Sequence, residues 1–241
     1  MNLDLLVRRA PGLTMTAVAL AGAAVTLLPG AAMAQDAAAF GVLDSEPASI
    51  DCSAIQTDPA ALGAASMYIV DPAQSEARYI AEEELANVGA NTAVGRTNTI
   101  QGAFLFDADG NPIPCSTIYV DVRTFVSDSS RRDNFLRGNT LQSDQYPLAE
   151  FVVSEIQNFT MPADGEETTF TLVGNFTLHG VTRAMAWEAT AARDGDTLTG
   201  SAKTEFDMAD FDIQKPIVGS VLSIEDVIKL EIDLVAVNSA A

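Results

Sequence analysis

"TFTLVGNFTLHG", residues 169–180, alternates between two kinds of side chain along nearly its whole length. Apolar or small residues occupy the even positions from 170 to 178, and most odd positions carry Thr or Asn. A period of two is typical of a β-strand with one buried face. The closing His179-Gly180 pair predicts a tight turn into a second strand. This stretch therefore predicts a hairpin in an all-β domain.

The same alternation recurs in "TIYVDVRTF" (117–125) and "VIKLEIDLVAV" (227–237). Gly-containing turn sequences separate such runs, as in "DADGNP" (107–112) and "RDGDT" (193–197). About eight strands at short, regular spacing predict an antiparallel up-and-down β-barrel or a sandwich.

Two segments do not alternate, and we expect short helices there. Residues 81–88, "AEEELANV", are good helix formers. Residues 127–142, "SDSSRRDNFLRGNTLQ", begin with Ser and Asp, which cap helices well, and Gly138 can end a helix. We expect Phe135 and Leu136 to point inward from this second helix, with its arginines on the outer side or rim.

The N-terminal 34 residues have the features of a secretory signal peptide. Arg8 and Arg9 precede an apolar run over 14–28, and Ala32-Met33-Ala34 forms a small-residue cleavage motif. We expect cleavage after Ala34 and a periplasmic or secreted product without stable membrane insertion. Residues 35–66 are expected to form a partly ordered arm, and residues 67–238 the barrel.

The charge and cysteine content limit the possible partners. A net charge of −20 repels phosphate backbones, so nucleic acid is excluded as a partner. Cys52 and Cys115 are the two cysteines, and in an oxidising compartment they are expected to form a disulfide. With one histidine and no C-x-x-C motif, neither a zinc site nor a redox pair is expected, and no cofactor is predicted.

Four quoted stretches together resemble the YceI-like family. They are "YIVDPAQSEARY" (68–79), "RRDNFLRGNTLQSDQYPLAEF" (131–151), "LVGNFTLHGVTRAMAWEA" (172–189) and "VIKLEIDLVA" (227–236). The resemblance covers residues 67 to about 237. It implies an exported, lipocalin-like barrel that binds a polyisoprenoid or similar long-chain lipid in an elongated cavity, closed near one end by a short helix.

The resemblance implies two groups of ligand-binding residues. The candidate cavity wall consists of Phe104, Phe106, Ile118, Val120, Val122, Phe151, Phe170, Leu172, Phe176 and Trp187. The candidate cavity mouth consists of Arg131, Phe135, Leu136, Arg137 and Tyr146. Without the resemblance, the same apolar side chains would be interpreted as an ordinary core, because a barrel of eight strands can be filled by side chains or hold one small ligand.

The arginines at 131, 132 and 137 have two interpretations. They can hold an anionic head group at the mouth, since a guanidinium matches a carboxylate or phosphate. Alternatively, they can pair with Asp128, Asp133, Asp144 or Glu150 and fix the helix on the barrel. Arg132 is the one we expect to be structural.

The sequence predicts a binding protein rather than an enzyme. His179, the single histidine, is expected to be a turn residue, and no G-x-S-x-G motif supports a hydrolase. The leading hypothesis is binding, sequestration or carriage of a polyisoprenoid, an isoprenoid quinone or a fatty-acid derivative by a monomer or homodimer. The alternatives are an interaction or stress protein with a filled barrel and an enzyme acting on a similar lipid.

Overall fold

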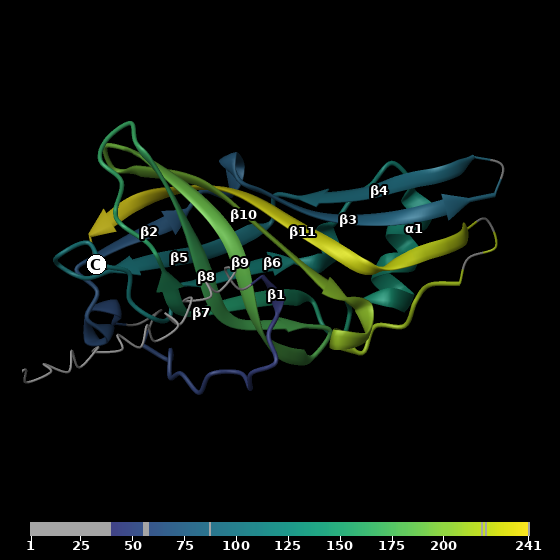
Figure 1. Cartoon of the computed structure of the whole chain (residues 1–241), viewed down its shortest axis with the longest axis horizontal. Helices are drawn as coiled ribbons and strands as arrows, with labels where there is room; N and C mark the ends of the chain where they lie inside the picture. The colour runs from purple at the N-terminus through teal and green to yellow at the C-terminus, as the bar shows by residue number, and fades with distance from the viewer. Residues whose placement is uncertain (1–39, 55–57, 87, 218, 220, 241) are drawn as a thin grey trace, which may run out of the picture. The chain divides into compact units, whose positions relative to one another are not determined.

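The computed structural model describes residues 40–54, 58–86, 88–217, 219 and 221–240 (Figure 1). The predicted signal peptide and residues 35–39 of the arm lie outside the described residues. Within the described part, the strands are β1 (Gly41–Val42), β2 (Ser66–Val70), β3 (Glu76–Leu85), β4 (Gly89–Thr97), β5 (Ile100–Phe106), β6 (Thr117–Asp121), β7 (Leu148–Gln157), β8 (Glu167–Leu178), β9 (Val181–Asp194), β10 (Thr197–Asp207) and β11 (Val221–Ala240). The helix α1 spans Ser130–Phe135.

The strands close into an antiparallel barrel. Pairing runs in a circle through β9, β8, β7, β6, β5, β2, β11 and β10, and β10 pairs back to β9 (Figure 1). Most neighbours in the circle are also consecutive in sequence, as expected for hairpins joined by the Gly-containing turns. The predicted eight-stranded, up-and-down antiparallel barrel is confirmed.

Two positions in the barrel wall are each occupied by two strands in series. β2 pairs with residues 236–240 of β11, and β3 continues along the same edge of β11 after the 3₁₀ turn η2 (Pro72–Gln74). β4 and β5 lie beside β3 and β2 in the same way. The pairing of β5 with β6 ends at Ile100. On β4, the strand before β5, Arg96 forms an isolated β-bridge with Val126 in the segment that follows β6.

The helix expected at residues 81–88 is wrong, because β3 continues to Leu85. Residues 77–85 pair with β4 on one edge, and most of them also pair with β11 on the other. Ala, Glu and Leu favour helices in isolation, but backbone pairing on two edges overrides that weak preference.

The second expected helix is confirmed as α1. The hydroxyl of Ser129 accepts a hydrogen bond from the backbone N–H of Arg132, so Ser129 caps the helix. The helical path does not stop at Gly138 but continues as the π-helical turn η4 (Leu136–Thr140). Helix α1 follows the 3₁₀ turn η3 (Val122–Thr124) at the end of β6, and its Arg132 forms an ion pair with Glu83 of β3.

Several contacts attach the described part of the arm to the barrel. β1 pairs with β9 through Gly41 and Val42. The side chain of Asn175 both accepts a hydrogen bond from the backbone N–H of Ala48 and donates one to its carbonyl oxygen. Cys52 and Cys115 form the predicted disulfide, which joins the arm to the loop between β5 and β6. The short 3₁₀ turns η1 (Pro59–Leu62) and η5 (Met208–Phe211) complete the described elements.

Aromatic side chains fill the middle of the barrel. Trp187 packs against Phe151 and Phe176 with ring centroids 5.6 and 5.9 Å apart, and Phe211 continues the cluster from Phe176 to Phe206. Three of these four pairs are edge-to-face, an arrangement that adds stability beyond the area that the rings bury. Phe176, Trp187 and Phe206 of this cluster bound the cavity described below.

Candidate functional site: an apolar cavity beneath helix α1

A cavity with a volume of about 620 Å³ lies among the described residues. It lies between β3, β4, the first half of β11 and α1. Its lining includes side chains from four parts of the chain. They are Ala77, Tyr79, Ala81, Glu83, Leu85 and Ala93 from β3 and β4, Phe135 and Leu136 from the helical segment, Ile224, Ile228 and Leu230 from β11, and Met208, Ile213 and Ile217 from the connection before β11. Nearly all of these side chains are apolar, so the cavity suits a hydrocarbon.

The cavity is empty of protein atoms because small residues occupy inward positions of its wall. Ala81 and Ala93 are paired across β3 and β4, and both line the cavity, as do Ala77 and Ala149. At the other end of the barrel, phenylalanines occupy the corresponding inward space and leave a second cavity of only about 60 Å³. Side-chain size at the inward positions therefore determines which half of the barrel is hollow.

The ten predicted wall residues divide among three environments. Four of them line the larger cavity: Val120, Val122, Phe176 and Trp187. Four others line the smaller cavity, which is too small for a lipid chain: Phe104, Phe106, Phe170 and Leu172. Ile118 and Phe151 are buried in the hydrophobic core and line neither cavity.

The five predicted mouth residues also separate. Arg131, Phe135 and Leu136 line the larger cavity. Arg137 instead donates hydrogen bonds to the carbonyl oxygen of Phe125 and to the side chain of Asn134, so it joins α1 to the preceding turn. Tyr146 lies elsewhere, with its ring 5.0 Å from that of His179 and against Gly180.

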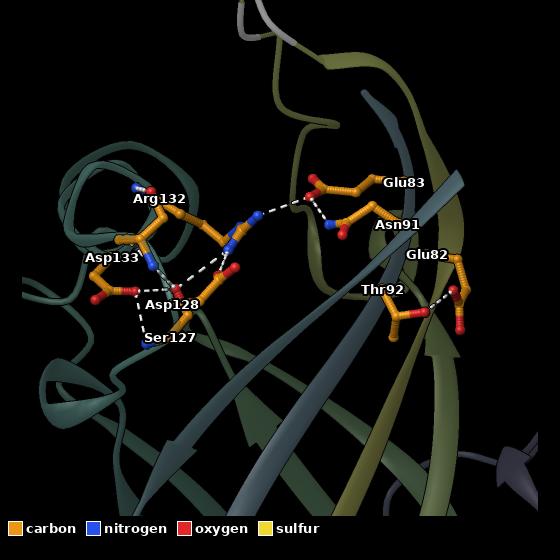
Figure 2. Close-up of polar contacts among 9 residues, drawn as sticks. Glu82, Glu83, Asn91, Thr92, Ser127, Asp128, Arg132 and Asp133 are labelled. Carbon is orange, nitrogen blue, oxygen red and sulfur yellow. Dashed lines mark hydrogen bonds and ion pairs between the residues drawn. The ribbon is translucent and has the colours of Figure 1, made fainter. Parts of the chain in front are cut away.

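Arg132 spans the space between α1 and the barrel wall (Figure 2). Its guanidinium donates to the carboxylate of Glu83 at 2.7 Å and also contacts that of Asp128. The amide of Asn91 donates a further hydrogen bond to Glu83 at 2.7 Å. The Glu83 side chain is 5 % exposed, so β3 presents a buried carboxylate that α1 neutralises.

Among the partners expected for the arginines, Asp128 is confirmed for Arg132. Asp133 serves another purpose, because its carboxylate accepts hydrogen bonds from the backbone N–H and hydroxyl of Ser127 at the start of the helical segment. Glu83 was missed as a partner because residues 81–88 were predicted to be helical. The alternation of "EARYIAEEEL" (76–85), with Ala77, Tyr79, Ala81 and Leu85 on one face, is the signal that could have identified it as inward-facing.

Tyr79 is a polar residue in this apolar lining. Its hydroxyl is buried and has no hydrogen-bond partner among the described residues. Burial raises the pKa of Tyr79 to about 12, so the side chain is neutral at physiological pH. Its ring lies against Gly95 of the neighbouring strand, where a Cβ atom would collide with it.

His179 lies in the β8–β9 turn, as the sequence predicts. Its backbone φ is 51°, that of Gly180 is 79°, and Nδ1 of the ring hydrogen-bonds the carbonyl oxygen of Phe211 at 3.1 Å. This ring is not among the residues that line the larger cavity. No group of three or more His, Cys, Asp or Glu side chains in the described part of the chain could hold a metal ion.

A closed antiparallel barrel with an apolar cavity under a short helix defines the lipocalin-like class of ligand-binding barrels. The YceI-like domain model matches residues 68–236, so the chain belongs to the YceI-like family. The predicted resemblance is thereby confirmed. No helix within the described ranges is long and apolar enough to cross a membrane.

Curated relatives include a UPF0312 protein of Vibrio parahaemolyticus, which is 28 % identical over 167 residues, 66 % of this chain and 83 % of the relative. Among solved structures, Burkholderia cenocepacia BcnA has a TM-score of 0.54 at 21 % identity, covering 69 % of this chain and 99 % of that one. A polyisoprenoid binding domain from Saccharophagus degradans has a TM-score of 0.58 at 15 % identity, covering 73 % and 99 %. Both structures share the fold of this chain.

Proposed function

We propose that this protein binds one long-chain apolar lipid in the cavity beneath α1 and sequesters or carries it without making or breaking a bond. A polyisoprenoid, an isoprenoid quinone and a fatty-acid derivative are the candidate ligands. The observation that carries the proposal is the apolar cavity of about 620 Å³, a volume within the roughly 300–1,000 Å³ range of small-molecule sites. Removing a hydrocarbon from water contributes about 25 cal/mol per Å² of buried apolar surface.

Other observations support the proposal. The chain belongs to the YceI-like family, and it shares its fold with a polyisoprenoid binding domain from another organism. A hollow barrel argues against a solid interaction module, and the single histidine lies in a turn away from the cavity lining. The signal-peptide features of residues 1–34 support a location in the periplasm or outside the cell.

The first test is mass spectrometry of an organic extract from protein purified without detergent. We expect one long-chain species at about one molecule per chain. An extract without such a species, from folded protein that also fails to retain a pyrene-labelled fatty acid added in ethanol, would overturn the proposal.

A substitution that fills the cavity tests its location. Ala81→Phe places an aromatic ring in the space beneath α1, so we expect loss of the bound lipid while the melting temperature is kept or raised. Ala90→Phe is the matched control, because Ala90 lies on the neighbouring strand β4 with its side chain exposed. Equal retention of lipid by both variants would show that the ligand does not occupy this cavity.

Arg131 is the proposed contact for an anionic head group. It lines the cavity, and no carboxylate of the described residues forms an ion pair with it, whereas Arg132 is already neutralised by two. Arg131→Gln should weaken retention of a pyrene-labelled fatty acid and leave that of the corresponding uncharged alcohol unchanged. An equal effect on both probes would exclude a charge contact.

A further inference from the structure

The end of the barrel that holds the cavity also carries exposed aliphatic side chains. Ile217 is 94 % exposed, Val88 is 70 % exposed and Leu222 is 65 % exposed, the three highest values among the large hydrophobic residues of the described chain. Isolated exposed aliphatic residues need no explanation. These three are different, because they lie at the same end of the barrel, close to the cavity.

Strand pairing brings the three residues to the same rim. Val88 lies in the turn between β3 and β4, and the pairing of Val221 with Leu85 places the start of β11 beside that turn (Figure 1). Ile217 lies in the connection leading to β11 and also lines the cavity. We call Val88, Ile217 and Leu222 the apolar rim. Of the three, Ile217 belongs to the cavity lining, and Leu222 directly follows Val221, which lines the cavity as well.

The charges near the apolar rim indicate which surface it can meet. Glu84, Glu225 and Asp226 are exposed on the flanking strands, and Lys215 is paired with Asp226 at 2.8 Å. Together with the net charge of −20, these carboxylates repel an anionic surface. A surface that accepts this rim must therefore be apolar below its boundary and carry little negative charge.

We propose that the apolar rim docks on a lipid bilayer of low net charge by inserting Val88, Ile217 and Leu222 below the head groups. This inference rests on the proposed function, because a ligand too apolar for water must pass directly between a membrane and the cavity. When the rim residues are inserted, the lipid ligand can pass from the acyl chains of the bilayer to the cavity along an apolar path. Several aliphatic side chains inserted together supply reversible binding, as for other interfacial proteins.

The test is flotation of the purified protein with phosphatidylcholine vesicles and with vesicles containing one third phosphatidylglycerol. We expect binding to the neutral vesicles, with weaker binding to the anionic ones that recovers as salt screens the repulsion. Ile217→Asp and Leu222→Asp should each lower the vesicle partition coefficient about tenfold or more. Ile69→Asp and Val237→Asp are matched controls that should not change it, because these exposed residues pair with each other near the opposite end of β11.

Loading the same variants with a pyrene-labelled fatty acid from ethanol separates this inference from the proposed function. The Leu222→Asp variant, whose altered side chain lies outside the cavity lining, should retain the probe loaded from ethanol but take it up slowly from vesicles. Wild-type protein that retains the probe yet does not float would overturn the docking proposal alone. Equal flotation of rim and control variants would also overturn it, as would a dimer that only the rim substitutions dissociate. Flotation without probe retention would instead overturn the proposed function and leave the docking surface standing.

Discussion

Replacing Arg132 with alanine would leave a buried carboxylate without its counter-charge. Glu83 would keep its hydrogen bond from Asn91, and Asp128, which is exposed, would be solvated by water. The cost therefore arises mainly at Glu83, whose side chain is 5 % exposed. The same substitution also removes the contact that joins α1 to β3 across the cavity (Figure 2).

The magnitude follows from the burial of the two partners. Breaking a fully buried ion pair costs about 3–5 kcal/mol, whereas an exposed pair contributes about 0–1 kcal/mol. Because Arg132 is 23 % exposed and Glu83 is almost inaccessible, we expect a loss of about 2–3 kcal/mol in the free energy of unfolding. For a chain of this length, that corresponds to a fall in melting temperature of roughly 4–12 °C.

Thermal and urea denaturation of the purified variants measure this loss. Arg131→Ala is the control, because it removes the neighbouring, exposed arginine and should change stability by no more than about 0.5 kcal/mol. Adding Glu83→Gln to Arg132→Ala removes the stranded charge and should restore most of the lost stability. If the Arg132 and Arg131 variants melt together, or if the second substitution restores nothing, the ion pair does not hold α1 to the wall.

Three further predictions concern the same barrel. The fold favours the neutral form of Tyr79, so its contribution to the free energy of unfolding is complete below pH 10, the ordinary tyrosine pKa, and is lost as the pH rises towards about 12. Tyr79→Phe should therefore flatten the profile of stability against pH between these values. An unchanged profile would contradict the raised pKa of Tyr79. Reduction of Cys52–Cys115, which closes a loop of 63 residues, should cost up to about 4 kcal/mol, measured by urea denaturation with and without reductant. Gly95→Ala should lower the free energy of unfolding by about 1–3 kcal/mol, because the added Cβ atom collides with Tyr79. Gly138→Ala is the control, with open space at its Cβ position and no expected loss of stability. Equal melting temperatures for the two variants would refute the collision.

The barrel could be predicted from the sequence because its strands alternate clearly. In β8 and β11, every second residue is apolar over most of the length, and Gly-containing turns separate neighbouring strands. The exception, residues 81–88, shows the limit of this signal. Ala81 and Leu85 alternate with glutamates as a strand requires, but Glu83 on the inward face disguises the pattern. One of the two strands that pair there, β11, is more than a hundred residues away in the sequence.

The position of the cavity could not be predicted in the same way. Alternation identifies inward positions but gives every inward apolar residue the same interpretation, so phenylalanines that fill one half of the barrel were grouped with residues that line the hollow half. Whether space remains depends on which inward residues face one another. Ala81 and Ala93 leave space because strand register pairs them, and the sequence does not specify that register.

Arg131 and Arg132 show how burial gives adjacent, identical side chains different roles. Arg132 points across the cavity and is neutralised by Glu83 and Asp128, so it contributes cohesion and little net charge. Arg131 is exposed beside the same cavity without a carboxylate partner from the described residues, so its charge remains available at the opening. In a chain with a net charge of −20, Arg131 is a positively charged side chain beside the cavity that forms no ion pair with the described carboxylates. A lipid with an anionic head could therefore orient itself at this opening without any change in the structural pair beside it.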